Sequence, residues 1–287
     1  MNVAGSPFSS AFRRHPWSRG VVHVLLIALS LIFLFPLLWM LSTALKPAAE
    51  VMVTPPRWIP DKLAWHNFAD AVGYIPFWTY TKNTLIACTL AATGTTISSA
   101  LVAYSFTRLE WPGRDFLFGV TLATMMVPFP AVMIPLHGIW KALGWTATLK
   151  PLWVPAAFGT AFNIFLLRQF FQRVPRSLAE AMMLDGASEL QIFLRVYLPL
   201  SRAALAVVAF FQFTFTWNDF LAPLLFLTDQ QTFTLPVGLD FYRSRLSGTQ
   251  WHYLMAAAVL TTAPLIVLFF FLQRSFLRGL SFMKNVD

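Results

Sequence analysis

The side chains best suited to chemistry lie in one polar stretch, residues 173–202, between two apolar runs. Its centre carries the acids Glu180, Asp185 and Glu189, and Gly186 directly follows the second acid. Arginines lie at its ends: Arg168, Arg173, Arg176, Arg195 and Arg202. Anionic lipid headgroups attract the ends and repel the centre, so we expect the centre to project towards water or a protein. The plainer alternative is a solvated loop that only joins its two neighbours.

Other chemical motifs are absent from the sequence. It contains no GxxxxGK[ST] phosphate-binding loop and no HExxH zinc motif. The histidines are scattered, which favours packed or interfacial roles: His15, His23, His66, His137 and His252. Cys88 is the only cysteine, so no disulfide can form within the chain and no cysteine cluster can bind a metal. We expect no catalytic residue, no metal site and no cofactor bound by this chain.

The composition predicts an all-α polytopic membrane protein. Of 287 residues, 57% are hydrophobic and 11% are charged, with a mean hydropathy of +0.62. Soluble domains carry about 25% charged residues. The net charge of +9 does not indicate nucleic-acid binding, because the basic residues sit at the ends of apolar runs.

Six apolar stretches are long enough to cross a hydrocarbon core that is about 30 Å thick. They are residues 21–45, 83–107, 116–140, 150–172, 203–228 and 254–273. With the N-terminus in the cytoplasm, thirteen Lys and Arg residues fall inside and eight outside, which favours cytoplasmic termini. We therefore expect a cytoplasmic segment at 1–20, a six-span domain at 21–280 and a cytoplasmic tail at 281–287. The first span is too long for a cleavable signal and should be retained.

The polar stretch at 173–202 has the local signals of a helical hairpin. Pro175 should end the preceding helix. Ser177 and Glu180 form a predicted capping box for a short helix over 178–185. Gly186 follows at the position where a helix end favours a left-handed residue. A second helix should begin near Ser188 and run towards Pro199.

The polar residues within the predicted spans allow two interpretations. Asp219 is the one acid inside a span, and a charge there usually marks a pathway or a partner. We assign Trp217, Asn218, Asp219 and Asn83 to a translocation pathway or gate, as one of these interpretations. The alternatives are that Asp219 lies near the outer end of a tilted span, hydrogen-bonded by Trp or Ser, and that the small polar residues are packing contacts between helices.

The 173–202 segment resembles the "EAA" signature of permease subunits of bacterial ABC importers. Glu180-Ala181-Met182 is followed at the family spacing by Asp185-Gly186-Ala187, then by Val196 and Leu198-Pro199. Met182 and Val196 replace the usual alanine and isoleucine. The blocks at 103–114, 217–225 and 273–280 extend the resemblance over roughly residues 20 to 282, towards the maltose and glycerol-phosphate type of sugar importer.

The resemblance implies a multi-pass subunit of the bacterial inner membrane whose hairpin docks on a separate ATPase. Coupling residues would be Glu180, Ala181, Asp185, Gly186, Ala187 and Pro199. Implied partners are a homologous permease, two cytoplasmic ATPases that bind ATP and Mg²⁺, an extracytoplasmic sugar-binding protein and the sugar. An ion-coupled secondary transporter is the alternative, although a single intramembrane acid makes a poor ion relay.

Overall fold

The computed structural model describes residues 16–244 and 248–284. Most of the cytoplasmic segment predicted at 1–20 and the last three residues of the predicted tail therefore lie outside the described residues. The first half of the chain forms α2 (Pro16–Ala44), α3 (Ala48–Val51), α4 (His66–Tyr74), α5 (Phe77–Arg108), α6 (Arg114–Ala123), η1 (Thr124–Met126), α7 (Phe129–Ala142), α8 (Lys150–Ala157) and α9 (Ala161–Phe171). The predicted tail overlaps the last helix, which continues to Lys284.

The second half begins with a helical hairpin. Its elements are α10 (Arg176–Leu184), α11 (Glu189–Ile192), the π-helix η2 (Phe193–Tyr197), α12 (Leu198–Leu200), α13 (Arg202–Trp217), α14 (Leu221–Phe226), η3 (Gln230–Thr232), α15 (Leu235–Asp240), β1 (Arg243–Ser244), β2 (Gly248–Thr249) and α16 (Trp251–Lys284). β1 and β2 form an antiparallel pair and are the only strands among the described residues. The prediction of a helical membrane protein is therefore confirmed at the level of its secondary structure.

Three helices are long and apolar enough to cross a membrane without a break: Gly20–Ala44, Phe77–Arg108 and Trp251–Gln273. They correspond to the first, second and sixth predicted spans. In two further places a pair of helices is bent at a short break between them. If each bent pair is counted as one span, the number of possible spans rises to five.

The other three predicted spans are wrong as continuous helices. Residues 116–140 bend by 97° between η1 and α7, because Val127 precedes a proline and takes an extended conformation. Residues 150–172 are divided into α8 and α9 at Gly159, which has a left-handed φ of 93°. Residues 203–228 break between Trp217 and Leu221.

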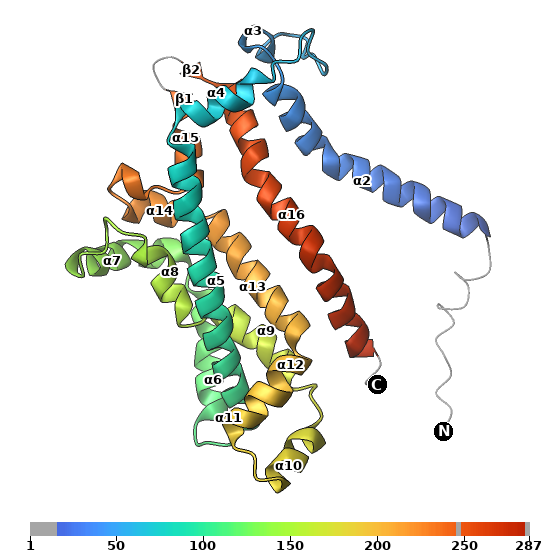
Figure 1. The fold of residues 1–287 in the computed structure, drawn as a ribbon, viewed down its shortest axis with the longest axis vertical. Helices are drawn as coiled ribbons and strands as arrows, with labels where there is room; N and C mark the ends of the chain where they lie inside the picture. The colour runs from blue at the N-terminus through green and yellow to red at the C-terminus, as the bar shows by residue number, and fades with distance from the viewer. Residues whose placement is uncertain (1–15, 245–247, 285–287) are drawn as a thin grey trace.

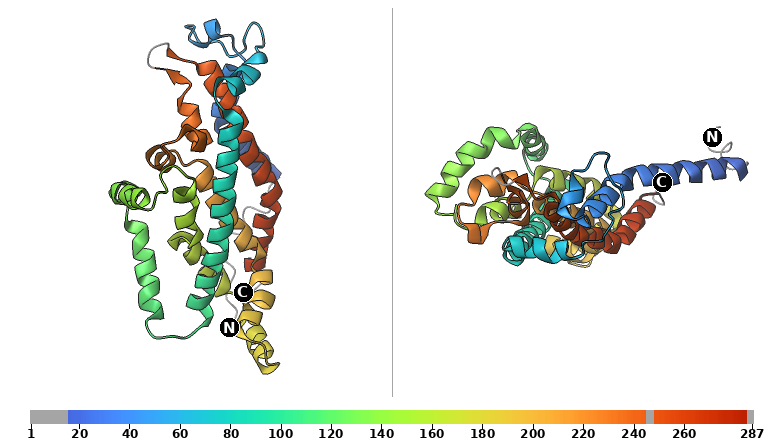
Figure 2. Two further views of the ribbon diagram at one scale, coloured as in Figure 1. Left: turned by 60° about the vertical axis from the view of Figure 1, so that its left-hand side comes forward. Right: turned by 90° about the horizontal axis from the view of Figure 1, so that it is seen from above.

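The long helices set the axis of the molecule. α5, α13 and α16 run side by side, and α8 and α9 pack on α5 (Figures 1 and 2). The hairpin α10–α12 lies at one end of this axis, and α3, α4 and the β1–β2 pair lie at the other (Figure 1). α2 contacts α16 and then slants away, so its apolar stretch is left unburied (Figure 1).

The 46–82 loop, which leads from α2 into α5, folds over the end opposite the hairpin (Figure 1). Asn67 is buried and donates hydrogen bonds from Nδ2 to the carbonyl oxygens of Ala44 and Lys46, at 2.8 and 2.9 Å. The Lys46 ammonium lies 4.2 Å from the centre of the Trp39 ring, and burial lowers the pKa of Lys46. Tyr242 donates to the carbonyl oxygen of Ala71 at 2.7 Å. These bonds fix the loop to α2, α4 and the segment before α16.

Close contact between α5 and α8 depends on Gly94. A Cβ atom at this position would lie 2.6 Å from Cβ and 2.8 Å from Cα of Ala157. One residue further along, Thr95 donates to the carbonyl oxygen of Ala156 at 2.5 Å. The absent side chain therefore allows a helix-to-helix hydrogen bond that a larger residue would separate.

We expect Gly94→Val to destabilise the helical bundle by about 1–3 kcal/mol, because the added side chain overpacks the contact with Ala157. The thermal unfolding temperature of the purified protein should fall. Gly119→Ala is the matched control, since its Cβ would meet no atom within 4 Å. Equal unfolding temperatures for Gly94→Val and Gly119→Ala would contradict this account of the α5–α8 contact.

Candidate functional site

The hairpin at 173–202 projects beyond the ends of the long helices (Figures 1 and 2). Its first helix begins at Arg176, two residues earlier than a cap at Ser177 would place it. Pro175 occupies the N-cap position and no side chain caps the helix, so the predicted Ser177–Glu180 capping box is wrong. The reciprocal capping bonds belong instead to the second helix. There Ser188 Oγ accepts from the Gln191 backbone N–H at 3.4 Å, and Gln191 Oε1 accepts from the Ser188 N–H at 2.9 Å.

The chain bends between the two helices at Gly186, which has the predicted left-handed conformation. Gly186 has a φ of 79°, and its N–H donates to the carbonyl oxygen of Met183 at 3.0 Å. The Ala187 N–H donates to the carbonyl oxygen of Met182 at 2.9 Å. This pair of bonds is a Schellman motif, in which the residue after the helix must accept positive φ. A Cβ at Gly186 would meet nothing within 4 Å, so backbone conformation and not space selects the glycine.

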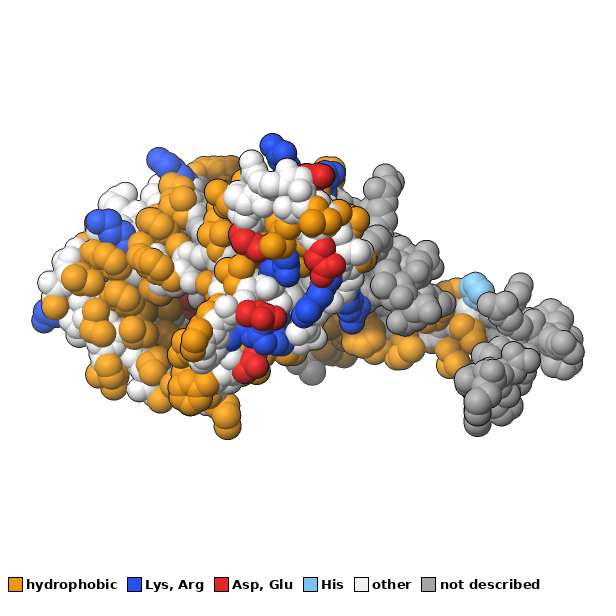
Figure 3. Space-filling model, turned by 90° about the horizontal axis from the view of Figure 1, so that it is seen from below, with side chains coloured by type: hydrophobic (Ala, Val, Ile, Leu, Met, Phe, Trp, Pro, Cys, Tyr) orange, Lys and Arg blue, Asp and Glu red, His pale blue; other side chains and the backbone are white. Residues whose placement is uncertain are grey.

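The two halves of the hairpin differ in burial. Apart from the buried Ala179, the first half is mostly exposed, including Glu180, Ala181 and Asp185, and Leu184 keeps 90% of its surface exposed. Figure 3 views the molecule from this end, where acidic and basic side chains gather among hydrophobic ones. The second half is buried through Ile192, Phe193, Val196 and Tyr197, which join a core with α5, α9 and α13. The hairpin therefore presents one half outward and anchors the other.

Tyr104 of α5 is the main anchor for the second half. It is buried, its ring centre lies 5.1 Å from that of Phe193 and 4.9 Å from that of Tyr197, and its hydroxyl donates to the carboxylate of Glu189. The Glu189 carboxylate is thus held inward, whereas Glu180 and Asp185 face outward. This contact joins α11 and η2 to α5.

Met182 and Pro199, both part of the EAA signature, contribute to the packing and the helix geometry of the hairpin itself. Met182 is half-buried and packs against the same core as Tyr104, so its bulk faces inward and leaves the outer face of Ala181 free. Pro199 lacks an N–H and its ring clashes with the carbonyl of Arg195 in a regular helix. The helix widens to a π-helix over Phe193–Tyr197 directly before it.

Three of the four predicted gate residues lie at the break between α13 and α14, and the fourth, Asn83, lies in α5. The side chains of Trp217 and Asn83 form hydrogen bonds that hold neighbouring segments together. Trp217 is buried and donates from Nε1 to the carbonyl oxygen of Thr261 at 3.2 Å. Asn83 donates to the carbonyl oxygens of Gln231 and Phe233 at 2.7 and 3.0 Å, which ties α5 to the η3 segment.

Asn218 and Asp219 lie in the break itself. Asn218 is exposed and donates to the carbonyl oxygen of Thr214 at 2.8 Å. Asp219 Oδ1 accepts from the backbone N–H of Ala222, in the first turn of α14, at 3.2 Å, so this bond goes to neither Trp nor Ser. Both side chains line an open hollow with Phe211, Phe215 and Phe220. Of the predicted gate residues, these two face space that a solute could enter.

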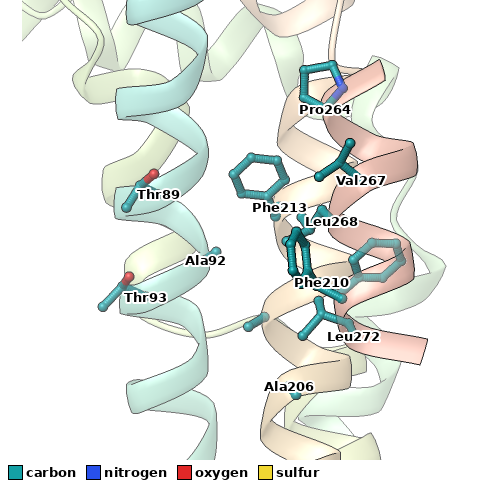
Figure 4. Close-up of a pocket in the computed structure, with 12 residues that line it drawn as sticks. Thr89, Ala92, Thr93, Ala206, Phe210, Phe213, Pro264, Val267, Leu268 and Leu272 are labelled. Atoms are coloured by element: carbon teal, nitrogen blue, oxygen red, sulfur yellow. The ribbon is translucent and has the colours of Figure 1, made fainter. Parts of the chain in front are cut away.

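A second hollow, of about 520 Å³, lies between α5, α13 and α16. Its labelled lining is almost entirely apolar, with Thr89 and Thr93 on one wall and Phe210, Val267 and Leu272 among the others (Figure 4). Such a surface suits an apolar helix or lipid chain and lacks the converging polar groups that fix a polar solute. Among the described residues, no three His, Cys, Asp or Glu side chains are placed to hold a metal ion.

Comparison with known families matches residues 96–282 to the family described as "Binding-protein-dependent transport system inner membrane component". The chain belongs to this family. The protein is the membrane permease subunit of an ABC importer and is not an enzyme, since the family is the membrane component and not the ATPase. The resemblance inferred from the EAA signature is thereby confirmed.

Curated relatives cover nearly the whole permease. It is 31% identical to YurM of Bacillus subtilis, a probable ABC transporter permease, over 93% of this chain and 89% of that protein. It is 32% identical to NgcG of Streptomyces coelicolor, a diacetylchitobiose uptake permease, over 89% of this chain and 85% of that protein. A solved bacterial ABC transporter that imports the acidic polysaccharide alginate shares the fold, with a TM-score of 0.78, 24% identity and coverage of 92% and 99% of the two chains.

Sequence reasoning assigned no role to Tyr104 and Arg108, although both lie in the 103–114 block that carries the family resemblance. Arg108 ends α5 and places Nη2 2.8 Å from Met183 Sδ on the hairpin. A tyrosine and an arginine one helical turn apart at a span end were the available signal. Their partners could not be read from the sequence, because they lie about 80 residues away in the chain.

We expect Tyr104→Phe to loosen the second half of the hairpin, because it leaves the half-buried Glu189 carboxylate without its donor, at a cost of about 1–3 kcal/mol. Backbone amides over 189–197 should exchange with solvent hydrogen faster. Tyr74→Phe, an exposed ring at the opposite end of the molecule, is the control. Unchanged exchange over 189–197 in Tyr104→Phe would show that the aromatic packing alone anchors the hairpin.

Proposed function

We propose that this permease imports a sugar or a sugar-like solute, and that the α10–α12 hairpin couples its movement to a separate ATPase. The observation that carries the coupling proposal is the division of the hairpin into an exposed half and a buried half. Glu180, Asp185 and the exposed Leu184 supply charge and apolar area together, which suits a protein partner better than water alone. Ala181 allows close approach of that partner, and Ala187 and Pro199 continue the motif into the core.

The buried half supplies the transmission. Nucleotide-driven movement of the docked ATPase would displace α10, and the bend at Gly186 would pass the force to α11 and η2. Tyr104 would then act on α5, which packs against α8, α9 and α13. Two discrete arrangements of these packed helices would constitute alternating access.

The partners follow from what the chain contains and from its family. The sequence has no phosphate-binding loop, so ATP and Mg²⁺ would be bound by two cytoplasmic ATPase subunits and no cofactor by this chain. The family name includes dependence on a binding protein, which we assign to an extracytoplasmic sugar-binding protein. A homologous second permease would complete the translocation pathway. The sugar class is supported by the diacetylchitobiose permease relative and by the resemblance to the maltose type.

The proposed topology has six crossings, with the third, fourth and fifth interrupted by the observed breaks. The Lys and Arg bias places the hairpin and both termini in the cytoplasm, and the 46–82 loop outside the cell membrane. The structure supports this arrangement because the hairpin and that loop occupy opposite ends of the molecule (Figure 1).

Within this scheme the break between α13 and α14 is our candidate gate. Asp219 and Asn218 face the open hollow, while Trp217 and Asn83 hold the surrounding helices and loop. Non-helical backbone at membrane depth is tolerated where it lines a cavity, and half-helix ends at such breaks commonly contact solutes.

Docking is tested by Glu180→Lys, which should place like charge against a basic acceptor on the ATPase. We expect normal membrane insertion, loss of ATPase association in pull-down and loss of transport. Asp61→Lys, at the opposite end, is the charge-matched control, and its exposed pair with Arg57 contributes little to stability.

The bend of the hairpin is tested by Gly186→Val, which should also abolish transport, because a β-branched residue resists positive φ. Gly186→Asn is the control, since asparagine tolerates positive φ and should retain transport. Transport at the unmutated rate in both Glu180→Lys and Gly186→Val would refute the coupling proposal.

Topology is tested with single cysteines in a Cys88→Ala background. Cys88 is buried, so its removal clears the background without opening the surface. Asp185→Cys should react with a membrane-impermeant maleimide only after the cells are opened, and Trp65→Cys should react in intact cells, since both positions are exposed. Labelling of both in intact cells is incompatible with the proposed orientation.

A further inference from the structure

A small polar hollow of about 120 Å³ lies where α5, the start of α6, α9 and the hairpin meet. Four arginines from four different segments line it: Arg108, Arg114, Arg168 and Arg176. Thr107, Gln172 and the ring of Tyr197 complete its polar wall. Arg108 and Arg114 form one pair along the chain and Arg168 and Arg176 form another, 54 residues later, so the fold brings the two pairs together.

The positive charge in this hollow is poorly compensated. Arg114 Nε lies 3.0 Å from Oδ1 of Asp115, and no other acid of the described residues lies within 4.0 Å of the four guanidinium groups. The nearby Glu189 carboxylate accepts from Tyr104. Arg108 Nε is buried without a hydrogen-bond partner, and Nη2 of the same residue faces only the weak acceptor Met183 Sδ.

An anion would stabilise this arrangement. Like charges gathered at one hollow repel one another, and the buried Arg108 Nε without a partner costs free energy. The Gln172 amide oxygen can accept from Arg168, but it carries no charge to offset the four guanidinium groups. Arg168 is held in place by the ring of Phe118, 4.1 Å from its guanidinium carbon, and by a 3.4 Å bond from Nε to the carbonyl oxygen of Phe106. The guanidinium fork matches the oxygens of a phosphate group, which can accept from several arginines at once. The missing component of the hollow is therefore an anion with several oxygens.

We propose that this hollow binds the phosphate group of an anionic phospholipid. The lipid source is favoured by α6, which starts at Arg114 and exposes Phe116, Leu117 and Val120 next to the hollow. Acyl chains could lie along this face while the headgroup phosphate contacts the arginines. The bound lipid would bridge α5, α9 and α10 and would stabilise the hairpin against the membrane helices. The proposal depends on the membrane setting of the proposed function but not on ATPase docking, so the two can fail separately.

The test uses the assembled transporter, purified through this chain and stripped of lipid. Native mass spectrometry would count phosphatidylglycerol bound during titration, with phosphatidylcholine and inorganic phosphate as separate arms. The variant is Arg108→Gln combined with Arg176→Gln, and the control is Arg173→Gln combined with Arg195→Gln, two exposed hairpin arginines outside the hollow. Arg176→Gln alone, at an exposed position, serves if the double variant does not fold.

We expect one phosphatidylglycerol to bind more tightly than phosphatidylcholine, and its affinity to fall about tenfold for each arginine removed from the hollow. The control should bind as the unmutated protein does. Equal phosphatidylglycerol affinity in variant and control would overturn the proposal. Binding of inorganic phosphate without preference for phosphatidylglycerol would overturn the lipid source. Loss of ATPase from the hollow variant with lipid binding unchanged would assign the arginines to a protein carboxylate and would also overturn it.

Discussion

Contact between Tyr104 and the second half of the hairpin is the interaction on which the rest of this structure depends. The hairpin is a short element with few backbone bonds of its own, and it cannot hold a defined direction without a core. Tyr104 supplies that core through Phe193, Tyr197 and the carboxylate of Glu189. With this half fixed, α10 can remain exposed and still keep a rigid relation to α5. An exposed surface that is rigidly connected to the membrane helices is what coupling requires.

The predicted third, fourth and fifth spans are interrupted helices, in contrast to the three long unbroken ones. Pro128 and Gly159 divide two predicted spans, and the third restarts at α14, where Asp219 accepts from the Ala222 N–H of the first turn. Each break exposes backbone groups that must be satisfied by side chains or water. The hollow beside Asn218 and Asp219 lies at such a break, whereas the apolar groove of Figure 4 lies between unbroken helices.

Local signals in the sequence predicted the features that depend on one segment. The bend at Gly186, the helix beginning at Ser188 and the three unbroken spans all follow from residue type and hydropathy. The cap at Ser177 failed because Pro175 takes the N-cap position and starts the first helix at Arg176. The breaks within the spans were missed because a hydropathy pattern reports how apolar a segment is and not where its backbone changes direction. The anchor at Tyr104 and the four-arginine hollow were not predictable, since each joins side chains far apart in the chain.

The most direct test of the central claim is chemical cross-linking at the outer half of the hairpin. In a Cys88→Ala background, Leu184→Cys in the assembled transporter should cross-link to the ATPase subunit through a short bifunctional maleimide and stop nucleotide-driven transport. Trp65→Cys, at the opposite end, should not reach the ATPase. A cross-link from Leu184→Cys that forms and leaves transport unchanged, or no cross-link at that position, would contradict coupling through this hairpin.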